Sequence, residues 1–220
     1  MSAFTALWKK EVRQELRQKH ALAGVAMYVL ATVFVCYLSF ETIETERVWG
    51  GLVWITGLFT AFNAMQKTFQ QEGGGTQLYL YTLASPRAVM LSKALYNAML
   101  VAILNLVSLA FFLLFFGDKM LADIDIVQFA LGMILGSSGL GITLTFVSGL
   151  AYKSGTGVGL VAILGFPLVI PLLITIVRFT TGAILGMTWL ENGLNLLVLI
   201  ILNGTSLLLS LLLFPYLWRE

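Results

Sequence analysis

The sequence predicts an all-α membrane protein with six transmembrane helices and both chain ends in the cytoplasm. Three observations predict it: the share of hydrophobic residues, the number of long apolar runs, and the uneven distribution of basic residues between the connections on the two sides of the membrane. Of the 220 residues, 59% are hydrophobic and 11% are charged. A soluble core of this size cannot bury so much apolar surface, so lipid must be the solvent. We expect one transmembrane domain over residues 1–220.

Six apolar runs each approach the roughly 20 residues that an α-helix needs to cross a hydrocarbon core about 30 Å thick. Lipid offers no partner for a bare backbone N–H or C=O, and the runs lack the alternation of barrel strands, so all six are expected to be helices. The first run is not followed by an Ala-x-Ala-like cleavage site and is predicted to be a retained anchor. The predicted spans are residues 22–40, 48–65, 94–116, 126–149, 158–177 and 194–214.

Basic residues are unevenly divided between the two sides of this pattern. Only Arg47, Lys119 and Arg178 fall on the side away from the chain ends. The positive-inside rule therefore predicts that both ends are cytoplasmic. Because the basic residues are sorted by membrane side rather than gathered along one face, the sequence indicates no nucleic-acid partner. Ten of the 13 Lys and Arg residues fall on the predicted cytoplasmic side: Lys9, Lys10, Arg13, Arg17, Lys19, Lys67, Arg87, Lys93, Lys153 and Arg219.

Residues 2–20 are predicted to form an amphipathic helix before the first span. Apolar residues recur three and four positions apart, and basic residues occupy most of the remaining arc. A basic face and an aromatic anchor suit a helix that lies in the plane of the cytoplasmic headgroups. The alternative is a charged, solvated helix that only satisfies the topology. The apolar positions are Phe4, Leu7, Trp8, Val12 and Leu16.

The longest polar connection, residues 66–92, lies on the predicted cytoplasmic side. Three glycines interrupt a helical pattern, a short amphipathic element follows, and Ser85-Pro86 ends it. The glycines do not form a phosphate-binding loop, because no lysine follows them as in Gly-x4-Gly-Lys-Ser/Thr. The segment is either a flexible hairpin or a docking element for a cytoplasmic partner. The candidate docking residues are Gln71, Glu72, Gly73, Gly74, Gly75, Thr76, Gln77, Leu78 and Tyr79.

The fifth run contains Pro167 and Pro171. Each proline removes a backbone donor from the helix, so a bend is expected there, either as a simple kink or as a moving, substrate-facing segment. Pairs of small residues such as Ser137 and Gly141 would let two helices approach closely, and we expect them to serve ordinary packing.

The sequence predicts no catalytic, cofactor-binding or metal-ligating residue. The predicted span interiors hold no ionisable residue, which disfavours a proton-driven transporter, and no charged ring or filter-like loop indicates a channel. His20 is the single histidine and Cys36 the single cysteine, so no metal cluster or disulfide framework is available. Any energy source for transport would therefore have to be another subunit.

Hydrogen bonds between helices are expected from Asn63, Asn97, Asn105, Gln128 and Asn203.

The chain resembles the CcmB family, the membrane permease of the cytochrome c maturation ABC system. Two segments carry the resemblance, and the length, the six predicted spans and the cytoplasmic N-terminus agree with it, so it covers nearly the whole chain. Residues 53–55 and 67–72, then Gly75-Thr76-Gln77-Leu78, Ser85-Pro86 and Lys93, resemble the second span and cytoplasmic loop of that family. Residues 164–174, which include Pro167 and Pro171, are similar to its fifth span. Phe166 and the glycine-rich stretch after Glu72 depart from the family pattern.

The resemblance implies an ABC-2-like exporter fold in a bacterial inner membrane, with two permease copies on two copies of a separate ATPase, CcmA. It also implies three further partners: the haem-handling subunit CcmC, the small subunit CcmD and the periplasmic haem chaperone CcmE. The chain would be no enzyme and would bind no cofactor directly. ATP would bind the ATPase, and partner subunits would handle haem.

In this interpretation ATP hydrolysis is coupled to haem delivery or to release of the haem-loaded chaperone. The segment 71–83 would sit in a groove of the ATPase, with the helix 4–16 as a brace. The proline-containing span and residues 179–192 would pass the movement outward. Two alternatives stay open: an ABC-2-type export permease for a lipid, drug or polysaccharide, and an assembly scaffold that does not couple to ATP.

Overall fold

The computed structural model describes residues 3–17, 19–40, 45–65, 85–116, 124–153 and 158–219. Within these ranges the chain is all α-helical, without strands. Helices α3, α5, α6, α7 and α8 are long and apolar enough to cross a membrane, and α2 offers a shorter apolar stretch, Ala23–Ser39. The fold class is therefore an all-α membrane protein, while the sixth span and the orientation stay predictions. The helices are α1 (Ala3–Arg17), α2 (Lys19–Ser39), α3 (Glu46–Met65), α5 (Pro86–Phe116), α6 (Ile126–Lys153), α7 (Val158–Ile184) and α8 (Trp189–Arg219).

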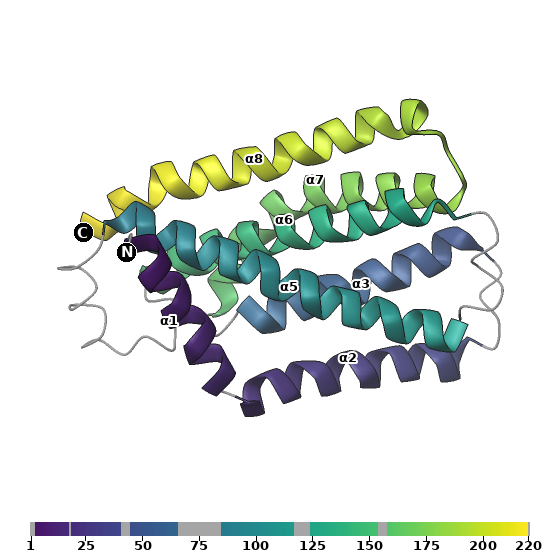
Figure 1. Cartoon of the computed structure of the whole chain (residues 1–220), viewed down its shortest axis with the longest axis horizontal. Helices are drawn as coiled ribbons and strands as arrows, with labels where there is room; N and C mark the ends of the chain where they lie inside the picture. Colours follow the sequence, from purple (N-terminus) through teal and green to yellow (C-terminus); the bar gives the residue numbers. More distant parts are fainter. Residues whose placement is uncertain are drawn as a thin grey trace.

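Helices α2, α3, α5, α6, α7 and α8 run along the long axis of the molecule, and α1 lies obliquely at one end (Figure 1). Both chain ends lie at this same end, as an even number of spans would require (Figure 1). Helix α6 is the most buried of the five candidate spans and α8 the least. Because α6 contacts α3, α5, α7 and α8, it forms the centre of the bundle.

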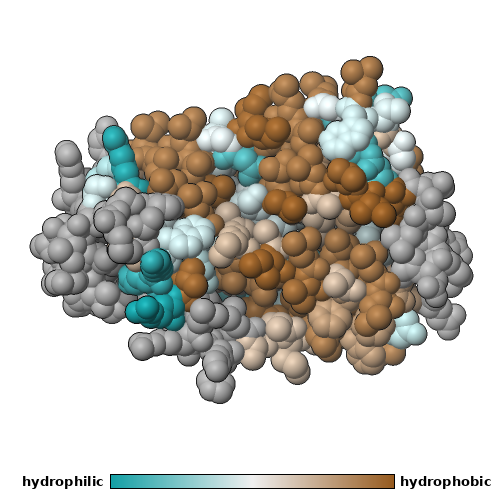
Figure 2. Space-filling model, viewed as in Figure 1, coloured by the Kyte–Doolittle hydropathy of each residue, from teal (hydrophilic) through white to brown (hydrophobic). Residues whose placement is uncertain are grey.

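Large apolar side chains lie both inside and outside the bundle. Trp49, Trp54 and Phe112 are fully buried in the main core. Along α8, by contrast, Leu190 and Leu194 are largely exposed. On the face shown in Figure 2, the described surface between the two ends is mostly hydrophobic. Such a broad exposed apolar surface is typical of a protein whose solvent is lipid.

Helix α5 begins inside the predicted polar connection, residues 66–92. The helix starts at Pro86, so residues 86–92 are its first turns rather than the end of a connection. Ser85 is the N-cap, since its Oγ accepts a hydrogen bond from the backbone N–H of Ala88 at 3.3 Å. Proline suits the next position because the N–H that it lacks would have no helical partner there. Ser85-Pro86 is therefore the start of α5.

Helix α7 is longer than the apolar run that predicted it. It continues to Ile184, and the candidate span Ile163–Ile184 includes Arg178. The predicted span ended at residue 177, so Arg178 lies just beyond that span but inside the helix, because the residues after Arg178 are apolar enough to extend it. The expectation that the span interiors hold no ionisable residue stays a prediction. Helix α7 also runs without interruption through Pro167 and Pro171, and the predicted bend there stays a prediction.

Candidate functional site

The candidate docking residues 71–79 lie outside the described residues, but both ends of the segment that carries them are described. The segment leaves α3 at Met65 and enters α5 at Ser85. We call the groups that hold these two ends the loop frame. Its members are Leu7, Glu11, Met65, Val89, Lys93, Asn97, Thr145 and Ser148.

Helix α1 is attached to the first turns of α5 by two contacts one helical turn apart. Leu7 is buried against Val89, and Glu11 Oε1 lies 3.2 Å from Lys93 Nζ. Leu7 and Glu11 are four residues apart, as are Val89 and Lys93, so one face of each helix meets the other. Only 1% of the Lys93 side chain is exposed, although lysine is almost never fully buried without a partner.

Two aromatic rings extend this attachment. The Trp8 and Tyr96 rings meet edge to face with centroids 6.1 Å apart, a favourable geometry for an aromatic pair. The predicted apolar face of α1 is thus turned toward α5 at Leu7 and Trp8, and Val12 on the same face is half-buried. Phe4 and Leu16 also lie in α1, but the structure does not describe their side chains. The placement of α1 among lipid headgroups stays a prediction.

The other end of the loop frame is the last residue of α3. Met65 is 1% exposed, and its carbonyl accepts a hydrogen bond from Ser148 Oγ at 3.5 Å. Thr145 Oγ1 lies 3.4 Å from Met65 Sδ and accepts a hydrogen bond of 2.8 Å from Asn97 Nδ2. The end of α3 is therefore tied to α6 and, through Thr145, to α5.

Close contact between α5 and α6 brings these polar groups together. A Cβ atom on Gly141 would lie 2.8 Å from both the Ala98 Cα and the Asn97 carbonyl oxygen. These are backbone atoms that cannot rotate away, so only glycine fits this crossing. The close approach expected for the Ser137 and Gly141 pair is found at Gly141.

Thr145→Val tests the link between the three helices. Valine keeps the shape of threonine but removes the hydroxyl that accepts the 2.8 Å hydrogen bond from the buried Asn97 amide, a loss of about 1–3 kcal/mol. We expect a lower midpoint of thermal unfolding in detergent, measured by tryptophan fluorescence. Thr205→Val is the control, since Thr205 is exposed on α8. Equal midpoints for the two variants would contradict a stabilising role of the Asn97–Thr145 hydrogen bond.

A second polar network closes the opposite end of the bundle. Gln128 Nε2 donates to the Met187 carbonyl at 2.8 Å and to Asp125 Oδ2 at 2.9 Å. Its Oε1 accepts a hydrogen bond of 3.0 Å from Asn192, which also donates to the Phe179 carbonyl at 2.9 Å. The start of α6, the end of α7 and the start of α8 therefore form one unit.

The carboxylate of Asp125 caps α6 in this network. The backbone N–H of Gln128 donates to it, followed by the Gln128 side-chain amide and the Val127 N–H, and these bonds lower the pKa of Asp125. A lowered pKa means that the stabilisation is present above the ordinary pKa of aspartate and is lost only as the pH falls through the lowered value. The cap is therefore intact at neutral pH.

Several sequence expectations are confirmed by these bonds. Asn97, Asn105, Gln128 and Asn203 each donate a hydrogen bond to a neighbouring helix or to the turn beside it. The sequence does not predict the ion pair of Lys93 and Glu11, because it indicates Lys93 only as a charge on the cytoplasmic side.

Comparison with protein families gives a match over nearly the whole chain. The family model described as CcmB protein matches residues 2–217, which include the loop frame and the network around Gln128. A search of the curated proteins found no match.

Proposed function

We propose the following role from the finding that the chain belongs to the CcmB family and so is a membrane subunit of a cytochrome c maturation ABC transporter. The chain transmits a conformational movement, driven by a separate ATPase, across the membrane. The family is a permease component of a haem transport system and is not itself an enzyme. We propose that ATP hydrolysis occurs in a CcmA-like partner. The work would drive haem delivery or release of a haem-loaded, CcmE-like chaperone.

The loop frame is the observation that carries this proposal. A partner that pulls on residues 71–79 would act on Met65 at one end of the segment and on Ser85 at the other. Met65 is held by α6, and the first turns of α5 are held by α1. Packed helices transmit displacement because protein interiors are dense and only slightly compressible. Force on the segment would therefore move α1, α3, α5 and α6 together.

Helices α5 and α6 carry this movement toward the other end of the bundle. With a rise of 1.5 Å per residue, the 28 residues of α6 span about 42 Å. At its far end Gln128 joins α6 to α7 and α8. We propose that this end, together with a bend at Pro167 and Pro171, acts on partner subunits outside. Two copies of the chain would work as a homodimer of ABC-2-like fold in a bacterial inner membrane, with CcmC-like and CcmD-like subunits.

Charge reversal and added bulk in the docking segment test the proposal. We expect Glu72→Lys combined with Gly75→Trp to prevent the ATPase from co-purifying, or to uncouple its turnover, and so to abolish cytochrome c production. Glu44→Lys, which makes the same charge change in the connection on the predicted outer side, is the control. Unchanged complex assembly and unchanged cytochrome c would contradict docking. Cytochrome c production with a hydrolysis-deficient ATPase would indicate a scaffold instead.

A further inference from the structure

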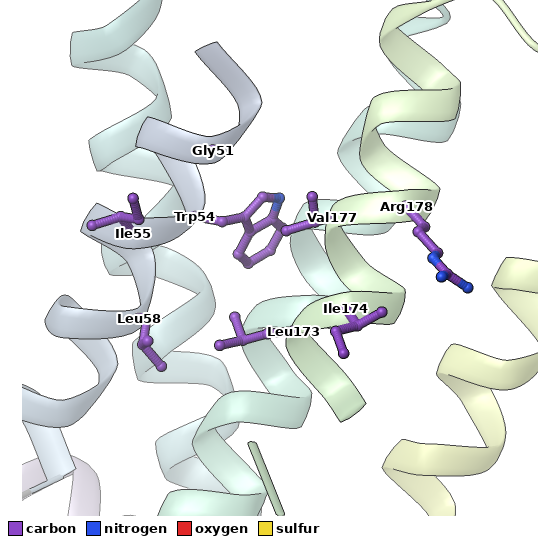
Figure 3. A pocket seen from close by; sticks show the side chains of 8 residues that line it. All are labelled: Gly51, Trp54, Ile55, Leu58, Leu173, Ile174, Val177 and Arg178. Carbon is purple, nitrogen blue, oxygen red and sulfur yellow. The ribbon is translucent and has the colours of Figure 1, made fainter. Parts of the chain in front are cut away.

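A groove opens on the surface of the bundle between α3 and α7. It has a volume of about 440 Å³. One wall carries Gly51, Trp54 and Leu58 of α3, and the other carries Leu173, Ile174 and Arg178 of α7 (Figure 3). The Trp54 indole donates a hydrogen bond of 2.9 Å to Thr180 Oγ1, which joins the two helices beside the groove. We call this the α3–α7 groove.

The lining is apolar except at one position. Below the level of Trp54 the walls are formed by Leu58, Leu173 and Ile174, which offer no polar side-chain atom. Gly51 leaves the opposite part of the groove open, since a Cβ built on it would meet nothing within 4 Å. The groove therefore has the shape and chemistry to hold a flexible hydrocarbon chain.

Arg178 lies at the rim of the groove, with its side chain directed away from Trp54 (Figure 3). The side chain is exposed, and no acidic side chain of the described ranges forms an ion pair with it. By helical rise the residue lies about 9 Å from the end of α7. An arginine at this depth is costly in lipid unless its guanidinium reaches the headgroup layer or pairs with an anion.

We propose that the α3–α7 groove binds one acyl chain of an anionic phospholipid whose phosphate pairs with Arg178. The cation at the rim matches the lipid phosphate, and a guanidinium can hold two phosphate oxygens at once. The apolar walls of the deeper part match the chain that hangs below the headgroup. The site is independent of the coupling role, because it involves neither the loop frame nor the network around Gln128.

Native mass spectrometry of delipidated protein, titrated with phosphatidylglycerol or phosphatidylcholine, tests the proposal. We expect one phosphatidylglycerol to be retained where phosphatidylcholine is lost. Arg178→Gln should weaken retention by about tenfold or more through loss of a charged hydrogen bond. Gly51→Leu should also weaken it by filling the groove. The matched controls are Arg47→Gln, an exposed arginine at the start of α3, and Gly204→Leu, where an added Cβ also meets nothing within 4 Å.

Four results would overturn the proposal. The first is equal retention of the two lipids, and the second is retention unaffected by either groove variant. The third is dissociation of a dimer by Gly51→Leu, which would show that a second copy covers the groove. The fourth is a porphyrin absorption band that only Arg178→Gln removes, which would assign the groove to haem. Arg178 is exposed, so its substitution leaves a folded protein to measure even where Gly51→Leu does not.

Discussion

Glu11→Gln is expected to detach α1 from α5 and to abolish most cytochrome c production. The substitution removes the carboxylate that lies 3.2 Å from the Lys93 ammonium, a group whose side chain is 1% exposed. Removing one member of a buried ion pair costs about 3–5 kcal/mol, because the remaining charge stays desolvated. Faster proteolysis within α1 and loss of cytochrome c in cells would report the effect.

The double variant Glu11→Met with Lys93→Met tests whether α1 needs the ion pair itself or only a well-packed contact with α5. A buried ion pair can often be replaced by apolar side chains of similar volume at little cost. We therefore expect this variant to restore both protection of α1 and cytochrome c production. Lys9→Gln is the control for lost charge on α1, since Lys9 is exposed on that helix, whereas Lys10 itself pairs with Glu11 at 3.7 Å. If Glu11→Gln behaved as wild type, attachment of α1 would have no part in coupling.

Gly141→Ala is expected to be the most disruptive single-methyl change in the bundle. The new Cβ would lie 2.8 Å from backbone atoms of Asn97 and Ala98, so α5 and α6 would have to move apart. Overpacking of this kind costs about 1–3 kcal/mol. It would also pull Asn97 away from Thr145 and loosen Met65 in the loop frame. Thermal unfolding in detergent and yield of folded protein would measure the loss.

Gly204→Ala is the matched control for this change. Gly204 lies in α8, where an added Cβ meets nothing within 4 Å. Alanine is favoured over glycine in a helix by up to about 1 kcal/mol, so this variant should unfold at the same or a higher temperature. If the Gly141→Ala protein were as stable as the Gly204→Ala protein, the close contact of α5 and α6 would contribute nothing to stability.

Hydrophobic pattern and charge predicted the helices well because each helix is a local property of the chain. The apolar runs located α3, α5, α6, α7 and α8, and periodicity located α1. The ends of α5 and α7 were less predictable. An apolar run marks where a helix meets lipid, whereas the helix continues as long as its caps and neighbours allow. Ser85, as N-cap, lets α5 begin at Pro86, before the apolar run that starts at residue 94.

Partners between helices could not be read from the sequence. Periodicity showed that Leu7 and Trp8 share a face of α1, but it could not show that α5 covers that face. Glu11 and Lys93 are separated by a long stretch of chain, and only the folded bundle brings them together. One sequence signal was available: Glu11 lies one turn after Leu7, and it is one of only two acids, with Glu15, in a helix that carries four basic residues.

ATP hydrolysis by the partner at the loop-bearing end is expected to move the opposite end of the bundle. Leu190 is 93% exposed at the start of α8 and can carry a spin label in a Cys36→Ala background, since the chain has one cysteine. Pulsed electron paramagnetic resonance then measures the distance between the two copies in the complex with the ATPase. We predict a shifted distance distribution when the ATPase is trapped during hydrolysis, and no shift in the Glu11→Gln variant. An unchanged distribution during active hydrolysis would contradict the claim.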